Sequence, residues 1–224
     1  RAVNPRSVRC VKLDGAVVKN ETISTTCIFF LIYILIIALS AFILAFDKFD
    51  LSTVFNNHIY DYGMDAFYDT LDTLKNANLP YIGAGINSSE AQSAYYLVIN
   101  GYKISFLNAT RAEKYILTPE ATEKSSGVFR AYDPTLLLET ISEVRKTSDY
   151  VIVLMHWGKE DSHELEQVQI DTGKMYIDAG ADLLVGSHAH VLQGMEFYNG
   201  KLIAHNLGDF IFNRETKDTG ILNV

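Results

Sequence analysis

Histidines occur in this chain at points where predicted strands end. His156 follows the apolar run Tyr150–Met155, and His188 and His190 follow Asp182–Val185. Ligands of open α/β sheets bind beyond the carboxyl ends of strands, so these side chains are expected to converge. Two histidines separated by one residue point the same way on an extended strand, and imidazole nitrogen is a ligand of Mn, Fe and Zn. The spacing predicts a metal site.

Each histidine also has a purely structural interpretation. A single histidine after a strand is more often a hydrogen-bonded structural residue than a ligand, and the metal site is favoured by the combination. Three further side chains are candidates for contact with substrate or for support of the ligands. Glu160 could reach a metal or a cationic group, Arg111 could meet an anionic substrate or be a solvated surface residue, and His205 could lie behind the ligands.

Alternating strand and helix patterns predict the elements that position these residues. Helices are indicated by apolar residues at helical spacing, buried strands by continuous apolar runs, and hairpins by Asn-Gly pairs between alternating segments. These signals predict helices over Met64–Asn78, Pro134–Thr147 and about 164–179, strands buried on both faces over Tyr150–Met155 and Asp182–Val185, a short strand in 81–85, and hairpins pairing Tyr95–Ile99 with Lys103–Leu107 and Gly194–Tyr198 with Lys201–His205. The polar stretch Asn108–Asp133 is expected to be a functional loop. The pattern predicts an α/β or α+β fold with mixed sheets.

An uncharged apolar run of twenty residues, Cys27–Phe46, precedes these elements. At about 1.5 Å per residue such a helix spans the roughly 30 Å hydrocarbon layer of a bilayer. Five Lys or Arg residues precede the run, which predicts a cytoplasmic segment 1–26, a single-pass signal anchor 27–46 and an extracytoplasmic domain 47–224. A buried core helix and a cleaved signal peptide are the alternatives.

The composition excludes some partners and frameworks. The net charge is -8, and the excess of acidic residues lies after the anchor, so binding to nucleic-acid phosphates is not expected. The two cysteines, Cys10 and Cys27, have no CxxC spacing and are too few for a disulfide framework or a thiolate metal site.

Four motifs in order resemble the CapA-like, poly-γ-glutamate capsule synthesis branch of the calcineurin-like metallophosphoesterases. They are Asn56–Gly63 (NNHxxDxG), His156–Glu160 (HWGxE), Gly180–Gly194 (GADLLxGxHxHVLQG) and Asn206–Phe210. The resemblance covers about residues 47–224. It implies a metallophosphatase-like four-layer αββα sandwich, truncated here and preceded by one transmembrane helix.

Carried over onto this sequence, the resemblance implies a role for each matching residue. Asn57, His156, His188 and His190 would be metal ligands, with Mn²⁺ the first expectation and Fe, Zn or Mg²⁺ alternatives. His58 would be the general acid that protonates a leaving oxygen, and Asp61 would orient its ring. Two cations would activate a bridging water.

The same resemblance implies acidic ligands before Asn57, from GD-type and NLE-type motifs that this chain lacks between the anchor and Asn56. Two interpretations are open: a fragment or rearranged gene product, which is favoured, and a natural short form that has lost catalysis. Either is expected to bind metal more weakly than a complete site.

Two functions are therefore expected from different classes. The first is a bacterial, membrane-anchored, metal-dependent phosphoesterase-like hydrolase in capsule or polyglutamate synthesis, acting on an anionic polymer or phosphoester. The second is a non-catalytic accessory or polymer-binding subunit that contacts other capsule synthesis proteins. An inactive gene remnant is the third alternative.

Overall fold

A six-stranded mixed sheet forms the centre of the fold. The computed structural model describes residues 51, 53, 56–112, 118–209 and 217–223. The strand order in the large sheet is β2-β3-β5-β6-β8-β7, and β1 and β4 form a separate two-stranded sheet. The elements are α2 (Gly63–Asn76), β1 (Ala84–Gly85), α3 (Ser88–Ala91), β2 (Tyr95–Ile99), β3 (Tyr102–Thr110), β4 (Gly127–Val128), α4 (Thr135–Arg145), β5 (Tyr150–Trp157), α5 (Gln167–Asp178), β6 (Leu183–His188), β7 (Met195–Tyr198) and β8 (Lys201–Ala204).

Parallel strands occupy the middle of this sheet and antiparallel strands its two edges. β3, β5, β6 and β8 are parallel, and α4 and α5 make the crossovers that parallel neighbours require. β2 and β7 each return by a tight turn and pair antiparallel with the next strand. Asn100 and Asn199 have positive φ, as the predicted Asn-Gly turns need. The predicted mixed α/β fold is confirmed.

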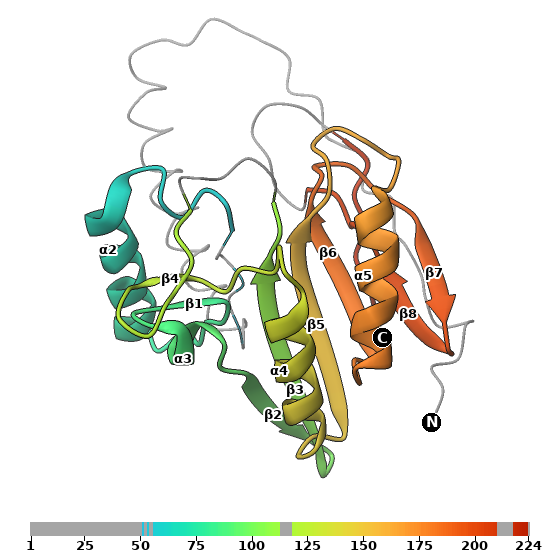
Figure 1. Cartoon of the computed structure of the whole chain (residues 1–224), viewed down its shortest axis with the longest axis horizontal. Coiled ribbons are helices and arrows are strands. Elements are labelled where there is room, and N and C mark those ends of the chain that lie inside the picture. The colour runs from blue at the N-terminus through green and yellow to red at the C-terminus, as the bar shows by residue number, and fades with distance from the viewer. Residues whose placement is uncertain (1–50, 52, 54–55, 113–117, 210–216, 224) are drawn as a thin grey trace, which may run out of the picture.

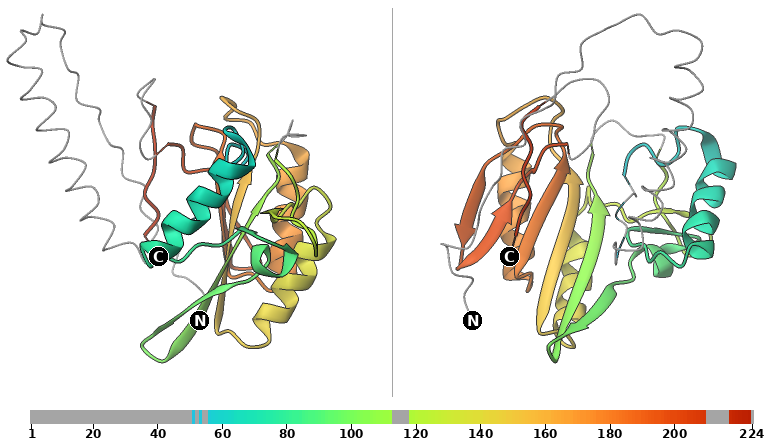
Figure 2. Two further views of the ribbon diagram at one scale, coloured as in Figure 1. Left: turned by 90° about the vertical axis from the view of Figure 1, so that its left-hand side faces the viewer. Right: turned by 180° about the vertical axis from the view of Figure 1, so that it is seen from behind.

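Both long crossover helices cover the same face of the sheet. Figure 1 shows α4 and α5 in front of the strands, and in the reverse view of Figure 2 the strands lie in front of them. In β5 the side chains facing these helices are buried, whereas the alternate residues are only half-buried. The prediction that β5 and β6 are buried on both faces was therefore wrong, because the helices among the described residues cover one face only.

The loop that carries Asn57 and His58 is held by a smaller unit beside β3. In this unit Phe67 and Leu71 of α2 pack with Ala84 and Val128 of the two-stranded sheet. Tyr60 stacks on Phe67, with ring centroids 4.5 Å apart, and so attaches the loop to the helix. The small unit thereby holds the N-terminal end of α2 beside the large sheet (Figure 1).

Several predicted elements have different limits in the structure. The short strand predicted in 81–85 is reduced to β1, and β3 extends beyond Leu107 to Thr110. The predicted loop Asn108–Asp133 contains β4, and its residues 113–117 lie outside the described residues.

The predicted cytoplasmic segment 1–26 and anchor 27–46 also lie outside the residues that the structure describes. Among the described residues, none of the helices has the length and apolar character needed to cross a bilayer. The described residues contain one large sheet with helices on one face, so the second large sheet of a four-layer sandwich is not among them.

Candidate metal centre

The carboxyl ends of β5 and β6 bring the predicted histidines together. The two strands are parallel neighbours, with His156 beside Ser187 and Trp157 beside His188. His156 lies inside β5 rather than after it, because the strand continues to Trp157. The imidazole rings of His156 and His188 have centroids 4.6 Å apart. The predicted convergence at the strand ends is therefore observed.

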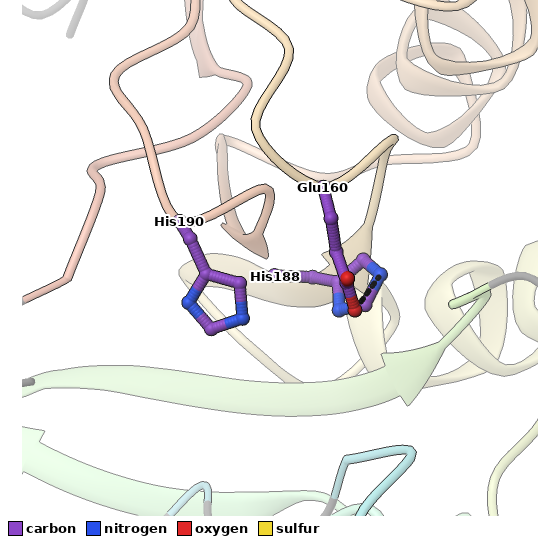
Figure 3. Close-up of side chains that lie close together, drawn as sticks. All are labelled: Glu160, His188 and His190. Carbon is purple, nitrogen blue, oxygen red and sulfur yellow. Dashed lines mark ion pairs between the residues drawn. The ribbon is translucent and has the colours of Figure 1, made fainter. Parts of the chain in front are cut away.

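Glu160, His188 and His190 form a cluster of potential metal ligands. One ligand atom from each lies within 4.8 Å of the other two. Glu160 Oε1 is 3.9 Å from His188 Nε2, and Figure 3 shows the glutamate reaching His188 from the loop after β5, with the His190 ring beside them. His188 is buried, whereas about half of the Glu160 side chain is exposed. The cluster thus has a buried side and an open side.

The backbone at these two histidines differs from the expected extended strand. φ is 99° at His188 and 58° at His190, a region that residues other than glycine seldom adopt. β6 ends at His188, so the two rings converge through a turn and not through strand alternation. Positive φ at non-glycine residues is found disproportionately at functional sites, where the surrounding structure holds it in place.

His156 makes a direct contact with Asn57, the other predicted ligand. His156 Nε2 lies 2.6 Å from Asn57 Oδ1, and His156 Nδ1 lies 3.1 Å from Ser187 Oγ. Because an amide oxygen only accepts, Nε2–H donates to it in this arrangement. Burial lowers the pKa of His156 well below 6.5, and the neighbouring His188, His190 and His58 lower it further. The ring is therefore neutral, which is the form that binds a metal.

His58 and Asp61 form the predicted pair on the loop before α2. His58 Nδ1 lies 2.8 Å from Asp61 Oδ2, and more than half of each side chain is exposed. The carboxylate accepts from Nδ1–H, which leaves Nε2 as the ring nitrogen able to exchange a proton. His58 is close enough to His156 for a charge on it to lower the pKa of His156. The pair thus lies at the edge of the candidate metal centre.

The other two candidates have different positions. Arg111 donates its backbone N–H to the carbonyl of His156 at 2.8 Å, and its guanidinium lies 5.5 Å from the centre of the Tyr132 ring. His205 is fully buried, where its Nε2 lies 3.2 Å from Glu196 Oε1 and its ring packs on Trp157. Neither residue belongs to the cluster of ligand atoms, whereas Glu160 does.

Two supporting residues were not predicted. Asp209 Oδ1 lies 2.7 Å from His190 Nδ1, and Ser187 Oγ contacts Nδ1 of His156. Asp209 lies in the motif Asn206–Phe210, and Ser187 lies in the motif Gly180–Gly194 and in β6, next to His188. Position in a motif was therefore the one signal in the sequence that could have found them. Which ring nitrogen each contacts depends on turns that the sequence does not specify.

The donor set fits a divalent transition metal. Two imidazoles and one carboxylate are ligands that suit Zn, Fe and Mn, and the Asn57 and His156 atoms lie beside them. The buried amide nitrogen of Asn57 has no hydrogen-bond partner within the described structure, so this amide is positioned for its oxygen alone. An ion bound by Oδ1 and Nε2 would take the place of this hydrogen bond, and the proton of the neutral ring would then lie on Nδ1, next to Ser187 Oγ. Glu160 is the carboxylate of this cluster. Residues 47–50 lie outside the part of the chain that the structure describes.

Known proteins resemble this chain over most of its length. The model of the bacterial capsule synthesis protein PGA_cap matches residues 14–214, a stretch that includes the apolar run 27–46. The PGA biosynthesis protein CapA of Bacillus subtilis is 36% identical over 75% of this chain and 44% of its own length. The capsule biosynthesis protein CapA of Bacillus anthracis is 34% identical over 75% of this chain and 42% of its own length. The chain spans less than half the length of these relatives.

A solved structure shares the fold. A candidate 5′-nucleotidase from Staphylococcus aureus, crystallised with α-ketoglutarate, superposes with a TM-score of 0.50 at 19% identity, over 71% of this chain and 32% of that one. At this identity the likeness concerns the fold alone, which is a mixed α/β sheet. The family match and the CapA relatives agree with the family that the four motifs resemble, and this chain belongs to the bacterial capsule synthesis protein family PGA_cap.

Proposed function

We propose that this protein is a membrane-anchored, metal-dependent hydrolase of the phosphoesterase type that acts in capsular poly-γ-glutamate synthesis. The observation that carries the proposal is the convergence of Glu160, His188 and His190 beside the Asn57–His156 pair. The capsule role is supported by membership of the family. The full four-layer sandwich and the anchor 27–46 are part of the same proposal.

In this proposal each residue has a distinct task. Glu160, His188 and His190 hold a divalent ion, with Mn²⁺ the first choice, and Asn57 and His156 provide further ligand atoms. A divalent ion held by these residues would supply Lewis-acid chemistry at this site. His58, with Nδ1 held by Asp61, gives a proton from Nε2 to the leaving oxygen. The open side of the cluster at Glu160 admits an anionic phosphoester or polymer.

A non-catalytic accessory role is the second candidate. It is favoured by the single carboxylate in the cluster, because two-metal hydrolysis needs anionic ligands to hold two cations close together. A relative from Mycobacterium tuberculosis, 26% identical over 71% of this chain, bears the name of a polyglutamine synthesis accessory protein. In this role the same surface would bind polymer or synthase partners without turnover.

Hydrolysis of p-nitrophenyl phosphate and bis-p-nitrophenyl phosphate separates the two candidates. The full chain in detergent, supplied with Mn²⁺, is compared with His188→Ala and with His163→Ala as the matched control. His163 is an exposed histidine that contacts the Leu192 carbonyl and lies outside the cluster. Turnover that His188→Ala abolishes and His163→Ala retains supports the hydrolase. Equal background rates in all three proteins support the accessory role.

A further inference from the structure

Each of three histidines in the candidate centre has a partner at Nδ1. His58 contacts Asp61, His156 contacts Ser187, and His190 contacts Asp209. In each case the contact engages Nδ1, so that Nε2 is the nitrogen available to bind a metal or to exchange a proton. Of these three, His190 combines a place in the described ligand cluster with a carboxylate partner that lies outside that cluster. This pairing of a ligand histidine with a carboxylate is a recurrent means of tuning metal sites.

We propose that Asp209 is the positioning residue of the metal centre. The inference rests on the metal site of the proposed function and extends it to a residue outside the ligand set. Asp209 Oδ1 accepts from Nδ1–H of His190 at 2.7 Å, so the ring presents Nε2 as its ligand atom. The negative charge also makes that nitrogen a stronger donor to a cation. Asp209 thereby adds a second negative charge beside the cluster, in which Glu160 is the carboxylate ligand.

The segment around Asp209 is built to hold it in place. The carbonyl of Leu207 accepts from Gly220 N–H at 2.8 Å and from the Thr219 hydroxyl at 2.9 Å. The backbone N–H of Gly208 donates to Asn206 Oδ1 at 3.0 Å, and Gly208 adopts a φ of 75°. A Cβ at Gly208 would lie 2.8 Å from the carbonyl of Asp218, so this approach needs glycine. These contacts fix the backbone immediately before Asp209.

The burial of the pair distinguishes it from an ordinary surface ion pair. The side chains of His190 and Asp209 are 26% and 19% exposed, whereas those of His58 and Asp61 are 56% and 51% exposed. Screening by solvent is weaker at the more buried pair, so its geometry and charge have a larger effect on the histidine. Asp209 is therefore expected to affect metal affinity, while Asp61 acts on the proton donor.

Metal titration of the metal-free full chain in detergent tests the proposal. Calorimetry measures Mn²⁺ affinity, and the visible absorption bands of bound Co²⁺ report the ligand geometry. Asp209→Ala removes charge and hydrogen bond, whereas Asp209→Asn keeps an oxygen acceptor and removes the charge alone. We expect Asp209→Ala to weaken Mn²⁺ binding about 10–100-fold and shift the Co²⁺ bands, with Asp209→Asn intermediate.

Glu196→Gln is the matched control, since Glu196 contacts His205, a buried histidine outside the ligand cluster. It should leave affinity and spectrum unchanged. If the wild-type chain binds no metal, the proposed function itself fails. If the wild type binds and both Asp209 variants match it in affinity and spectrum, the positioning role is wrong. Should Asp209→Ala not fold, Asp209→Asn decides on the same two readouts.

Discussion

At the scale of single residues, Glu160 is the carboxylate that lies among the ligand atoms. Its Oε1 is 3.9 Å from His188 Nε2, and half of its side chain is exposed. Replacement by glutamine keeps the size of the side chain and removes the anionic ligand. We expect Glu160→Gln to weaken Mn²⁺ binding by at least about tenfold, as loss of a direct ligand should cost no less than loss of a supporting residue. Calorimetry beside the exposed control Glu164→Gln checks this, and equal affinity of the two variants contradicts it.

His58 gives a prediction that separates catalysis from metal binding. Its ring contacts Asp61 and lies outside the cluster of ligand atoms. Where the chain hydrolyses phosphoesters, His58→Ala should lower kcat about 10²–10⁴-fold, the usual contribution of a general acid. Mn²⁺ affinity should remain that of the wild type. Steady-state kinetics and metal titration on the same preparation test both statements, and parallel losses of kcat and affinity would place His58 among the ligands instead.

Three of the candidate ligands could be placed together from the positions of strand ends alone. His156, His188 and His190 come after apolar runs, and parallel neighbours in a sheet necessarily bring such positions together. Asp209 and Ser187 could not be assigned as partners of particular nitrogens. Their contacts depend on the positive φ at His190 and on the turn around Gly208, which are set by tertiary packing.

At the scale of elements, the close packing of β6 against the segment after β8 depends on one glycine. A Cβ at Gly186 would lie 1.8 Å from the carbonyl oxygen of His205 and 2.5 Å from Nε1 of Trp157. Gly186→Ala should therefore lower the free energy of unfolding by about 3 kcal/mol, the upper part of the range for overpacked cores. Gly194→Ala is the control, because its Cβ would meet its nearest neighbour at 3.9 Å. Denaturant unfolding should show a large loss for the first variant only.

His205, the residue that follows β8, is expected to make the stability of the fold depend on pH. Burial lowers the pKa of His205 below 6.5, although the contact with Glu196 opposes the shift. Between the folded pKa and 6.5 the unfolded chain binds a proton that the folded chain does not, so stability falls as the pH drops below 6.5. The slope is at most about 1.4 kcal/mol per pH unit for one group.

His205→Asn tests this dependence. Because the pKa of His156 is also lowered, the substitution should flatten the slope of unfolding free energy between pH 7.5 and 5 and not abolish it. Denaturant titrations of metal-free protein at several pH values provide the measurement. A slope identical to that of the wild type would show that His205 takes no part.

Patterns of spacing identified most elements, and tertiary contacts set their ends. The helical spacing of Phe67 and Leu71 and the Asn-Gly turns were sufficient for α2 and both hairpins. Burial of β5 was overestimated, since a continuous apolar run does not reveal whether one or both faces are covered. β4 has two residues, too few to leave a periodic signal.

At the scale of the whole molecule, the proposed anchor 27–46 makes a topological prediction. Cys10 should lie in the cytoplasm, whereas Glu143, an exposed residue of α4, should lie outside. In a Cys10→Ser background, Glu143→Cys should react with a membrane-impermeant maleimide in intact cells, because the domain faces outward. The wild-type Cys10 should react only after the cells are permeabilised. The reverse pattern, or release of the protein from membranes by alkaline carbonate, would contradict the anchor.

The pairing of Asn57 with His156 has a kinetic consequence. These residues are separated by 99 positions, and the contacts of His156 with Ser187 and of His190 with Asp209 span 31 and 19. Long loops close late on average, because their entropy must be lost before the contact is gained. Metal binding should therefore report the last stage of folding. An ion bound there would slow unfolding and leave the folding rate nearly unchanged, so metal would extend the lifetime of the folded chain without helping it to form.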